Sequence, residues 1–345
     1  MRHSSDTEPG ISRKRADERS WAYFDPNGKR VTERDEIDRL NAVALPPAYE
    51  HAWFCADPNG HLQATGIDAR GRKQYRYHAD YRAKRDTAKY DGLVEFGKAL
   101  PRLRRQVEAD LKRRHLGRDT VLAAVVRLLD TEHIRIGNEQ YAKENKSFGA
   151  TTLRVRHLRR KGSKMLMRFT GKHGIVHEMT ITDGHLKRVC KRCQELPGQM
   201  LFQYVGDDGE ARPISSGDVN DYIRSATKGE FTAKHFRTWG ASVIAFDQLL
   251  GKSENARISI KTVVEPVAEA LGNTVAMSRK SYVHPALLDA VKEDSRDPLD
   301  GMDRPRARAR LSSAEVGLLE YLARGTKKPR RTRAPTAEQP AKRAA

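Results

Sequence analysis

The sequence lacks the features of membrane-spanning, secreted and nucleotide-driven proteins. Its apolar runs all fall short of the ~20 residues that a membrane helix needs, and its first residues contain no apolar stretch of the signal-peptide type. The three cysteines are too few for a disulfide framework, which favours a reducing compartment. Neither a G-x-x-x-x-G-K-[ST] loop nor a G-x-G-x-x-G element after a strand occurs, so chemistry driven by ATP or carried by a dinucleotide is not expected.

Positive charge, in contrast, is in large excess. The 345 residues include 65 Lys and Arg against 45 Asp and Glu, which gives a formal net charge of +20. A charge of this size favours a polyanionic partner, such as nucleic acid or an anionic surface. With 38% hydrophobic and 32% charged residues, the chain is expected to be soluble and long enough for one large domain or two ordinary ones.

Composition and periodicity divide the chain into four segments. Residues 1–20 are polar, alternate in charge sign and lack periodicity, which predicts a disordered lead-in. In residues 21–80, short β-type runs alternate with turn signals such as Asp57-Pro58-Asn59-Gly60, which predicts a small antiparallel sheet. Helical spacing dominates residues 81–325, and residues 326–345 are a basic, low-complexity tail. The expected fold class is therefore α+β, with a β-rich N-terminal domain followed by a mainly α-helical domain that carries a small β-sheet or hairpin.

Two β-type elements carry basic residues in exposed positions. In the run Gly71–His78, alternation places Lys73, Tyr75 and Tyr77 on one face, which is therefore cationic and aromatic together. Within the helical part, the runs 165–169 and 175–181 flank the sequence Gly171-Lys172-His173-Gly174. This pattern predicts a hairpin with a lysine at its tip.

The densest positive charge lies between Glu144 and Glu178, where no acidic residue occurs. Its basic residues are Lys146, Arg154, Arg156, Arg159, Arg160, Lys161, Lys164, Arg168 and Lys172. A solvated face would explain an isolated basic run, but this one coincides with strands and turns. Together with the basic strand at 72–77 it suggests a clamp on a nucleic-acid duplex, in which phosphate contacts supply most of the affinity.

Metal chemistry finds little support in the sequence. Cys190 and Cys193 form a lone C-x-x-C pair, whereas structural zinc normally takes four ligands from two such pairs. We therefore expect the two thiols to pack in a helix. Asp207 and Asp208 lie in a turn between glycines with no matching carboxylates nearby, which favours a loop tip over a two-metal nuclease site. No metal and no cofactor are predicted.

An enzyme that acts on DNA phosphates without metal or nucleotide needs cationic or polar hydrogens and a hydroxyl nucleophile. Arg135 and Arg237 each lie beside an apolar helical stripe, where an unpaired guanidinium is costly. Each therefore needs an anion or a carboxylate partner, and a structural ion pair remains the alternative for either alone. Tyr282 lies among cations in Ser278-Arg279-Lys280-Ser281-Tyr282, although by itself it would be an ordinary residue of an amphipathic helix.

Taken in order, these segments resemble the type IB DNA topoisomerases of the small bacterial and poxvirus-like kind, over roughly residues 21–289. The first catalytic arginine of that family lies in an Arg-x-Gly-x-x-x-Tyr element, which Arg135 to Tyr141 match. The general-acid lysine of the family lies in a Gly-Lys hairpin turn, which Lys172 matches. The second arginine lies in Lys-x-x-Arg-Thr, which Lys234 and Arg237 match.

The resemblance extends to the nucleophile and to the residue that precedes it. Tyr282 matches the tyrosine of the family's Ser-x-x-x-Tyr element. Nine residues earlier the poxviral pattern has a histidine, whereas this chain has Asn273, whose amide also donates hydrogen bonds. The strand beginning Gly71-Arg72-Lys73 is similar to the family's amino-terminal DNA-contacting strand.

The resemblance implies a cycle of strand cleavage and religation that needs neither ATP nor metal. Tyr282 would attack a phosphodiester, leaving a 3′-phosphotyrosyl link and a free 5′-hydroxyl while the duplex rotates and supercoils relax. Arg135, Arg237 and Asn273 would contact the non-bridging oxygens. Lys172, aided by Lys234, would protonate the leaving 5′-oxygen.

The partner implied is double-stranded DNA, clamped by a monomer in the cytoplasm of a bacterium, at the nucleoid. The residues expected to contact DNA lie on the amino-terminal strand, in the Arg-x-Gly element and in the basic run: Arg72, Lys73, Gln74, Tyr75, Tyr77, Tyr141, Arg154, Arg156, Arg159, Arg160 and Lys161.

Two alternative functions remain open. A tyrosine site-specific recombinase shares the arginine, lysine and tyrosine chemistry. That family, however, has a histidine three residues before its second arginine, where Lys234 stands, and the β-rich first domain fits the topoisomerases better. A non-enzymatic basic nucleoid protein would explain the charge of +20 but not the spaced catalytic set.

Overall fold

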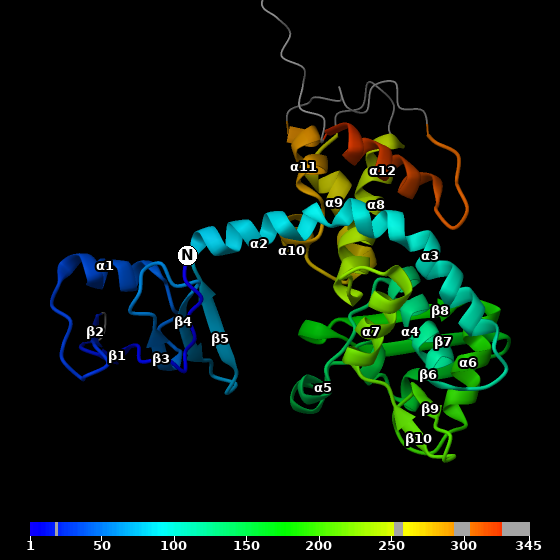
Figure 1. Ribbon diagram of the computed structural model, residues 1–345, viewed down its shortest axis with the longest axis horizontal. Coiled ribbons are helices and arrows are strands. Elements are labelled where there is room, and N and C mark those ends of the chain that lie inside the picture. Colours follow the sequence, from blue (N-terminus) through cyan, green and yellow to red (C-terminus); the bar gives the residue numbers. More distant parts are fainter. Residues whose placement is uncertain (18–19, 252–257, 293–303, 326–345) are drawn as a thin grey trace, which may run out of the picture. The chain divides into compact units, whose positions relative to one another are not determined.

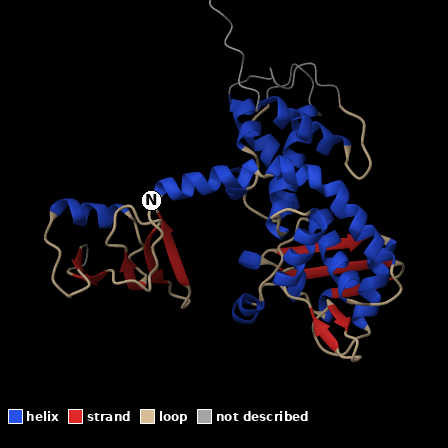
Figure 2. Ribbon diagram, in the orientation of Figure 1, coloured by secondary structure: helices blue, strands red, loops and turns tan. Residues whose placement is uncertain are grey.

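The computed structural model describes residues 1–17, 20–251, 258–292 and 304–325, and it divides into two compact units between Asp91 and Gly92 (Figure 1). Figure 2 shows a β-rich first unit and a mainly helical second unit with small sheets, which confirms the expected fold class. The sequence places the boundary at 80/81, where the pattern changes from strand to helix. The structure places it after α2 (Ala79–Asp91), because this helix groups by its contacts with the first unit. The predicted basic tail lies outside the described residues.

The first unit is a five-stranded antiparallel sheet with the strand order β2-β1-β3-β4-β5. Its strands are β1 (Ile11–Arg15), β2 (Trp21–Phe24), β3 (Glu50–Phe54), β4 (Leu62–Ile67) and β5 (Lys73–Tyr77). The helix α1 (Arg34–Ala42) buries Leu40 against the core residues Tyr23 and Phe54 of the sheet. The small antiparallel sheet predicted from the turn signals is therefore present.

The expected disordered lead-in differs from the structure. Strand β1 lies inside it and pairs with both β2 and β3. Ile11 is 5% exposed and belongs to the core of the sheet, and the Ser4 hydroxyl, also buried, donates to Leu62 O (3.1 Å). A strand with one covered face needs few apolar residues, so the polar composition of residues 1–17 concealed this strand.

The second unit is built around helix α8 (Ala233–Leu250), which packs against α3, α4, α7, α9, α11 and α12. The other helices of this bundle are α3 (Leu93–Lys112), α4 (Arg118–Glu132), α7 (Ser216–Thr227), α9 (Ile260–Leu271), α10 (Val275–Ser281), α11 (Pro285–Lys292) and α12 (Ser313–Gly325). Trp239 of α8 passes so close to α3 that a Cβ on Gly97 would lie 2.2 Å from its ring. This contact requires glycine at position 97.

A buried ion-pair cluster joins three helices of the bundle. Arg104 of α3 binds Asp130 of α4 (2.8 Å) and Glu315 of α12 (2.7 Å). Trp239 Nε1 also donates to Glu315 (2.9 Å), which connects α12 to the centre of α8. Helix α12 begins with a capping box, in which Ser312 and Glu315 bond each other's backbone N–H groups.

Two small sheets and two short helices complete the second unit. A three-stranded sheet has the order β6-β7-β8, formed by β6 (Leu158–Lys161), β7 (Lys164–Thr170) and β8 (Val176–Ile181). A hairpin is formed by β9 (Gln203–Val205) and β10 (Ala211–Pro213), and the helices are α5 (Glu139–Asn145) and α6 (Gly184–Gln194). Asp207 and Asp208 lie in the turn of the β9–β10 hairpin, as the sequence predicts.

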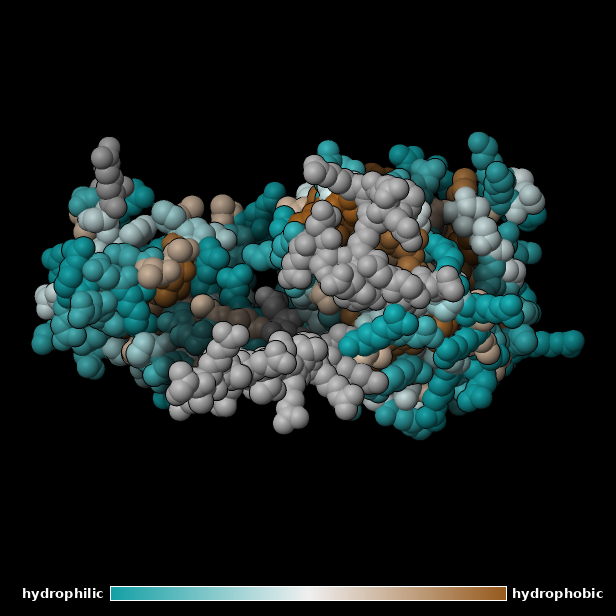
Figure 3. Space-filling model, turned by 90° about the horizontal axis from the view of Figure 1, so that it is seen from above, coloured by the Kyte–Doolittle hydropathy of each residue, from teal (hydrophilic) through white to brown (hydrophobic). Residues whose placement is uncertain are grey.

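The C-x-x-C pair lies within α6, and both thiols are fully buried. Burial raises the pKa of Cys193 to about 12, and its Sγ donates to Gln203 O (3.7 Å). Across the part of the chain that the structure describes, no group of three or more His, Cys, Asp and Glu side chains is placed to hold a metal ion. The surface visible in Figure 3 is largely hydrophilic, and none of the described helices is long and apolar enough to cross a membrane.

Candidate active site

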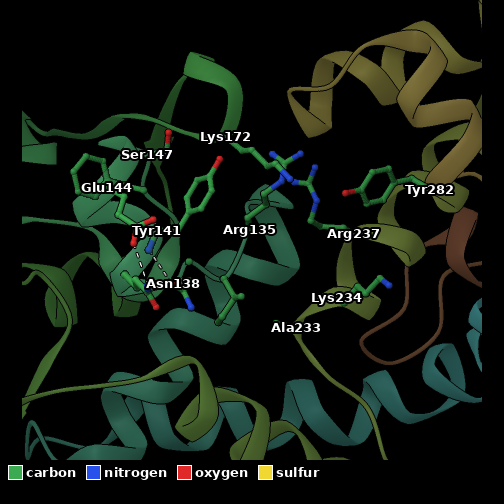
Figure 4. A pocket seen from close by; sticks show the side chains of 14 residues that line it. Arg135, Asn138, Tyr141, Glu144, Ser147, Lys172, Ala233, Lys234, Arg237 and Tyr282 are labelled. Atoms are coloured by element: carbon green, nitrogen blue, oxygen red, sulfur yellow. Dashed lines mark hydrogen bonds between the residues drawn. The ribbon is translucent and has the colours of Figure 1, made fainter. Parts of the chain in front are cut away.

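A cavity of about 650 Å³ in the second unit gathers residues that are far apart in the sequence. Among the residues that line it are Arg135, Lys172, Lys234, Arg237 and Tyr282. In Figure 4 the ends of the Arg135, Lys172 and Arg237 side chains point to one region, and the Tyr282 hydroxyl points toward the Arg237 guanidinium. The structure therefore brings together the residues that the sequence analysis expects to act on a phosphate.

Arg135 lies in the loop that follows α4, and this loop crosses another backbone segment at close range. Ala150 N donates to Arg135 O (2.8 Å). Gly137 has a φ of +95°, and a Cβ there would lie 3.1 Å from the backbone of Gly149. Only glycine fits this crossing without strain, which explains the Arg-x-Gly spacing.

Arg237 is almost fully enclosed, with 4% of its surface exposed. Its guanidinium donates to His133 O, at the residue that caps α4, and to Leu271 O, the last residue of α9 (3.0 Å). Carbonyls at helix C-termini lack intrahelical donors and carry the negative end of the helix dipole, so they suit a cation. Burial, followed by the positive charge of Arg135, lowers the pKa of Arg237 to about 10, and the side chain stays charged at neutral pH.

Asn273 binds Arg135 and retains a free donor. Gly272 caps the C-terminus of α9 with a φ of +57°, and Asn273 N donates back to Ala268 O (2.9 Å). Arg135 Nη2 donates to Asn273 Oδ1 (2.7 Å), which leaves the amide Nδ2 buried and without a partner among the described residues. A buried donor that stays unpaired costs about 1–3 kcal/mol. Next to two guanidinium groups, such a donor indicates a site for an anion.

The backbone at Tyr282 is anchored to the helix that carries Arg237. Tyr282 ends α10, and its N–H donates to Ser278 O (3.0 Å). Ser242 of α8 is fully buried, its Oγ accepts from His284 N (3.1 Å), and the same Oγ lies 3.5 Å from Tyr282 O. One helix thus fixes the positions of both the tyrosine and the arginine.

The hydroxyl of Tyr282 is easier to ionise than that of an exposed tyrosine. Burial by itself raises its pKa, but Arg237 and then Arg135 more than offset that effect, so the net pKa lies below 10.0. The Arg237 Cζ atom lies 5.0 Å from the centroid of the tyrosine ring. The two arginines that would bind a phosphate therefore also favour the nucleophilic phenolate.

The two candidate lysines are placed differently. Lys172 is exposed in the turn between β7 and β8, as the sequence predicts, and no carboxylate of the described residues pairs with it. Lys234 is the second residue of α8 and is also exposed. Although Lys234 lines the same cavity, Figure 4 shows its amino group apart from the guanidinium groups.

The predicted DNA-contacting strand is β5, in the first unit. Tyr75 and Tyr77 are 49% and 41% exposed, and their rings stack with centroids 6.2 Å apart. Lys73, on the same face, is paired with Asp6. On the other face, Arg72 binds Asp68 (2.7 Å) and Gln74 donates to the same carboxylate (2.9 Å). The two tyrosines are thus presented to solvent, whereas Lys73 and the neighbouring Arg72 already have carboxylate partners.

The basic run divides into an exposed and a paired part. Its exposed members among the expected DNA contacts are Arg156, Arg159, Arg160 and Lys161. Arg154 is only 16% exposed and binds Glu139 at the start of α5 (2.6 Å), which gives it a structural contact. Tyr141, on α5, lines the cavity (Figure 4).

Sequence reasoning missed two residues that hold the site, His133 and Ser242. The His133 carbonyl binds Arg237, and the His133 ring fills the space above Gly240, where a Cβ would lie 2.4 Å from it. Gly240 lies three residues after Arg237 in α8, so a glycine in mid-helix was the available signal for a close neighbour. No pattern marks Ser242, because a helical serine is ordinary until its hydrogen-bond partners are known.

Comparison with known proteins identifies related families for both units. Residues 78–297 match the family model described as eukaryotic DNA topoisomerase I, catalytic core. Residues 20–68 match the model described as bacterial DNA topoisomerase IB, N-terminal domain. The first of these matches covers more than half of the 345 residues.

Individual relatives agree with the family models. The DNA topoisomerase 1B of Acanthamoeba polyphaga mimivirus is 31% identical over 286 residues, which are 79% of this chain and 85% of the viral protein. The DNA topoisomerase 1B of vaccinia virus (strain Copenhagen) is 22% identical over 256 residues, 71% of this chain and 76% of that protein. Among solved structures, the XerH site-specific recombinase bound to its palindromic difH substrate gives a TM-score of 0.36 at 14% identity, over 56% of this chain and 50% of that one.

Proposed function

Because the chain belongs to the type IB DNA topoisomerases, we propose that Tyr282 is the residue with which it breaks and rejoins one DNA strand. The chain is an isomerase of this class, and DNA is its partner. The observation that carries the assignment is the contact of one buried arginine, Arg237, with the ring of Tyr282 at the edge of a cavity that Arg135 also lines. Of the other described tyrosines, only Tyr141 lines this cavity, and Tyr141 has no such contact with Arg237.

The proposed reaction exchanges one phosphodiester for another. The Tyr282 oxygen passes its proton to solvent water and forms a bond to the phosphorus, while the bond from phosphorus to the 5′-oxygen breaks. The leaving 5′-oxygen takes a proton from Lys172, acting as general acid. The products are a 3′-phosphotyrosyl link and a free 5′-hydroxyl. Because the covalent link conserves the energy of the broken bond, the reverse reaction reseals the strand without ATP.

The charge that develops on the phosphate is matched by groups already held in place. Arg135, Arg237 and the Nδ2 group of Asn273 would donate to the non-bridging oxygens. Backbone and side-chain bonds position all three before substrate arrives, so little reorganisation is needed in the transition state. Lys234 has at most an accessory role in this scheme, because its amino group lies away from the guanidinium groups.

Two finer features belong to the same proposal. We propose that a single copy acts as a monomer and that both units bind one duplex as a clamp, through the face of β5 that carries Tyr75 and Tyr77 and through the exposed arginines of β6. The expected location is the bacterial nucleoid, in keeping with the net charge of +20.

Relaxation of supercoiled plasmid in EDTA without ATP tests the proposal. The parent and the control Tyr204→Phe, which removes a hydroxyl on β9 outside the cavity, should relax both positive and negative supercoils. The parent and Tyr204→Phe should also yield a protein–DNA adduct when the reaction is quenched with denaturant. Tyr282→Phe should bind DNA but neither relax it nor form an adduct. An adduct formed by Tyr282→Phe would refute the assignment. A folded, DNA-bound parent that forms no adduct would refute it as well.

A further inference from the structure

His177 fills the space between two turns that each present a residue of the active site. A Cβ on Gly171 would lie 2.7 Å from the His177 Nε2 atom, and a Cβ on Gly272 would lie 2.6 Å from its Cε1 atom. Gly171 immediately precedes Lys172, and Gly272 immediately precedes Asn273. The imidazole is therefore in contact with both turns at once, and both contacts depend on the absence of a side chain.

The turn at the end of α9 is fixed without His177. Asn273 N bonds Ala268 O, Gly272 N bonds Ala268 O and Glu269 O, and the Asn273 side chain accepts from Arg135. This turn is consequently a rigid reference point in the site. Its position should be insensitive to the size of the side chain at 177.

The Lys172 turn closes on its own backbone, and the residue before it, Thr170, accepts from Phe148 N (2.8 Å). Its backbone hydrogen bonds join Gly171 N to Ile175 O (2.7 Å) and Gly174 N to Gly171 O (3.2 Å). Lys172, like the two residues that follow it, is exposed at the tip of the hairpin. These bonds define the shape of the turn, but they do not set its distance from α9, which the ring of His177 spans.

The ring itself is held firmly and is uncharged. It stacks on Phe169, its cross-strand neighbour, with centroids 5.1 Å apart and planes inclined by 17°. Burial lowers the pKa of His177, and the charges of Arg237 and Arg135 lower it further. At neutral pH the imidazole therefore acts on its surroundings by contact and not by charge.

We propose that His177 is a positioning residue, which seats the Lys172 turn against the end of α9 and so brings the Lys172 amino group to the leaving 5′-oxygen. The inference rests on the proposed function, in which Lys172 is the general acid. In this role, the β7–β8 hairpin sets the distance between the Lys172 amino group and the groups that bind the phosphate.

Single-turnover cleavage of two matched duplexes tests the role. One duplex has the natural 5′-oxygen at the cleavage site, and the other has a bridging 5′-sulfur, which leaves as a thiolate and needs no acid because a thiol has a pKa near 8.5. His177→Ala should slow cleavage of the oxygen substrate by about 10- to 100-fold, as expected for a displacement of the acid by about 1 Å. On the sulfur substrate it should cleave within about threefold of the parent. The control His185→Ala, at an exposed site on α6, should match the parent on both.

A double-mutant cycle tests the contact itself. Gly171→Ala adds a methyl group that would overlap the ring of His177. The ring or the turn must shift to make room, so this variant should also slow cleavage of the oxygen substrate. Combined with His177→Ala, the same methyl group enters vacated space, and the double variant should cleave faster than the product of the two single effects predicts. Independent effects would contradict the proposed contact.

The outcomes separate this inference from the function on which it rests. If the sulfur substrate rescues Lys172→Ala but not His177→Ala, the positioning role of His177 is refuted and the proposed function stands. If it rescues neither variant, Lys172 is not the acid and both proposals fail. An oxygen-substrate rate for His177→Ala equal to that of the parent refutes the positioning role alone.

Discussion

Replacement of Arg237 by lysine should remove most of the strand cleavage even though it keeps the positive charge. The guanidinium of Arg237 donates to two carbonyls, His133 O and Leu271 O, that lie at the ends of different helices. Five N–H donors on a rigid fork can do this and still face a phosphate, whereas the single nitrogen of lysine cannot. The lysine variant should therefore behave almost like Arg237→Ala.

The expected size follows from the number of donors lost. Loss of one preorganised donor to the developing charge costs about 10²- to 10³-fold in rate, or about 2.7–4 kcal/mol. A buried carbonyl left without its donor costs about 1–3 kcal/mol of stability, and each kcal/mol should lower Tm by about 2–4 °C for a unit of this size. In Arg237→Ala, the pKa of Tyr282 should also rise, because burial still disfavours the phenolate after its main cation is gone.

The assay is single-turnover formation of the covalent adduct on a duplex whose cleaved end dissociates, measured across pH. Arg279→Lys, at an exposed position on α10, is the matched control and should cleave like the parent. For Arg237→Ala, the ascending limb of the pH profile should move to higher pH. A folded Arg237→Lys variant that cleaves within about threefold of the parent would refute the reasoning.

Three other perturbations have definite expected results. Lys172→Ala should slow single-turnover cleavage by about 10²- to 10⁴-fold, and a bridging 5′-sulfur at the cleavage site should restore most of the rate; equal loss on both substrates would exclude Lys172 as the acid. Gly137→Ala, at a φ of +95°, should cost about 1–3 kcal/mol in thermal unfolding, whereas Gly184→Ala, with open space around its Cβ position, should not. Glu315→Gln should cost about 1.5–3 kcal/mol in chemical denaturation at pH 7, because it removes the charge from the buried contact with Arg104, which keeps its pair with Asp130. Arg104, with Trp239, outweighs burial and lowers the pKa of Glu315 below 4.5, so the stabilisation is complete above that value and is lost as the pH falls through the folded-state pKa. The difference between parent and variant should therefore shrink at acidic pH, and a constant difference would contradict this account.

Local features of the sequence were sufficient to predict most of the elements and to name residues that the structure brings together at one cavity. Hairpin turns, the stripe of α8 and the lysine at the tip of the β7–β8 turn depend on neighbours within a few positions, and the structure shows each of them. The roles proposed for Arg135, Arg237 and Tyr282 followed from the resemblance of their motifs to a known family, because the residue types alone left a structural ion pair or an ordinary helix position open. Strand β1 was missed, because its pairing partners supply the core that its own residues lack.

The sequence by itself determined which side chains are available to the proposed site, whereas tertiary structure decided their geometry and their electrostatics. The two acceptors of Arg237 are backbone carbonyls, which every residue type has, so no side-chain pattern reveals them. The same holds for Ser242 beneath Tyr282 and for His177 between two glycines, since their roles depend on distances between segments up to about a hundred residues apart. The lowered pKa of Tyr282 likewise exists only once two arginines outweigh the effect of burial on one hydroxyl. Such effects arise from the folded arrangement of charges and not from the order of residues along the chain.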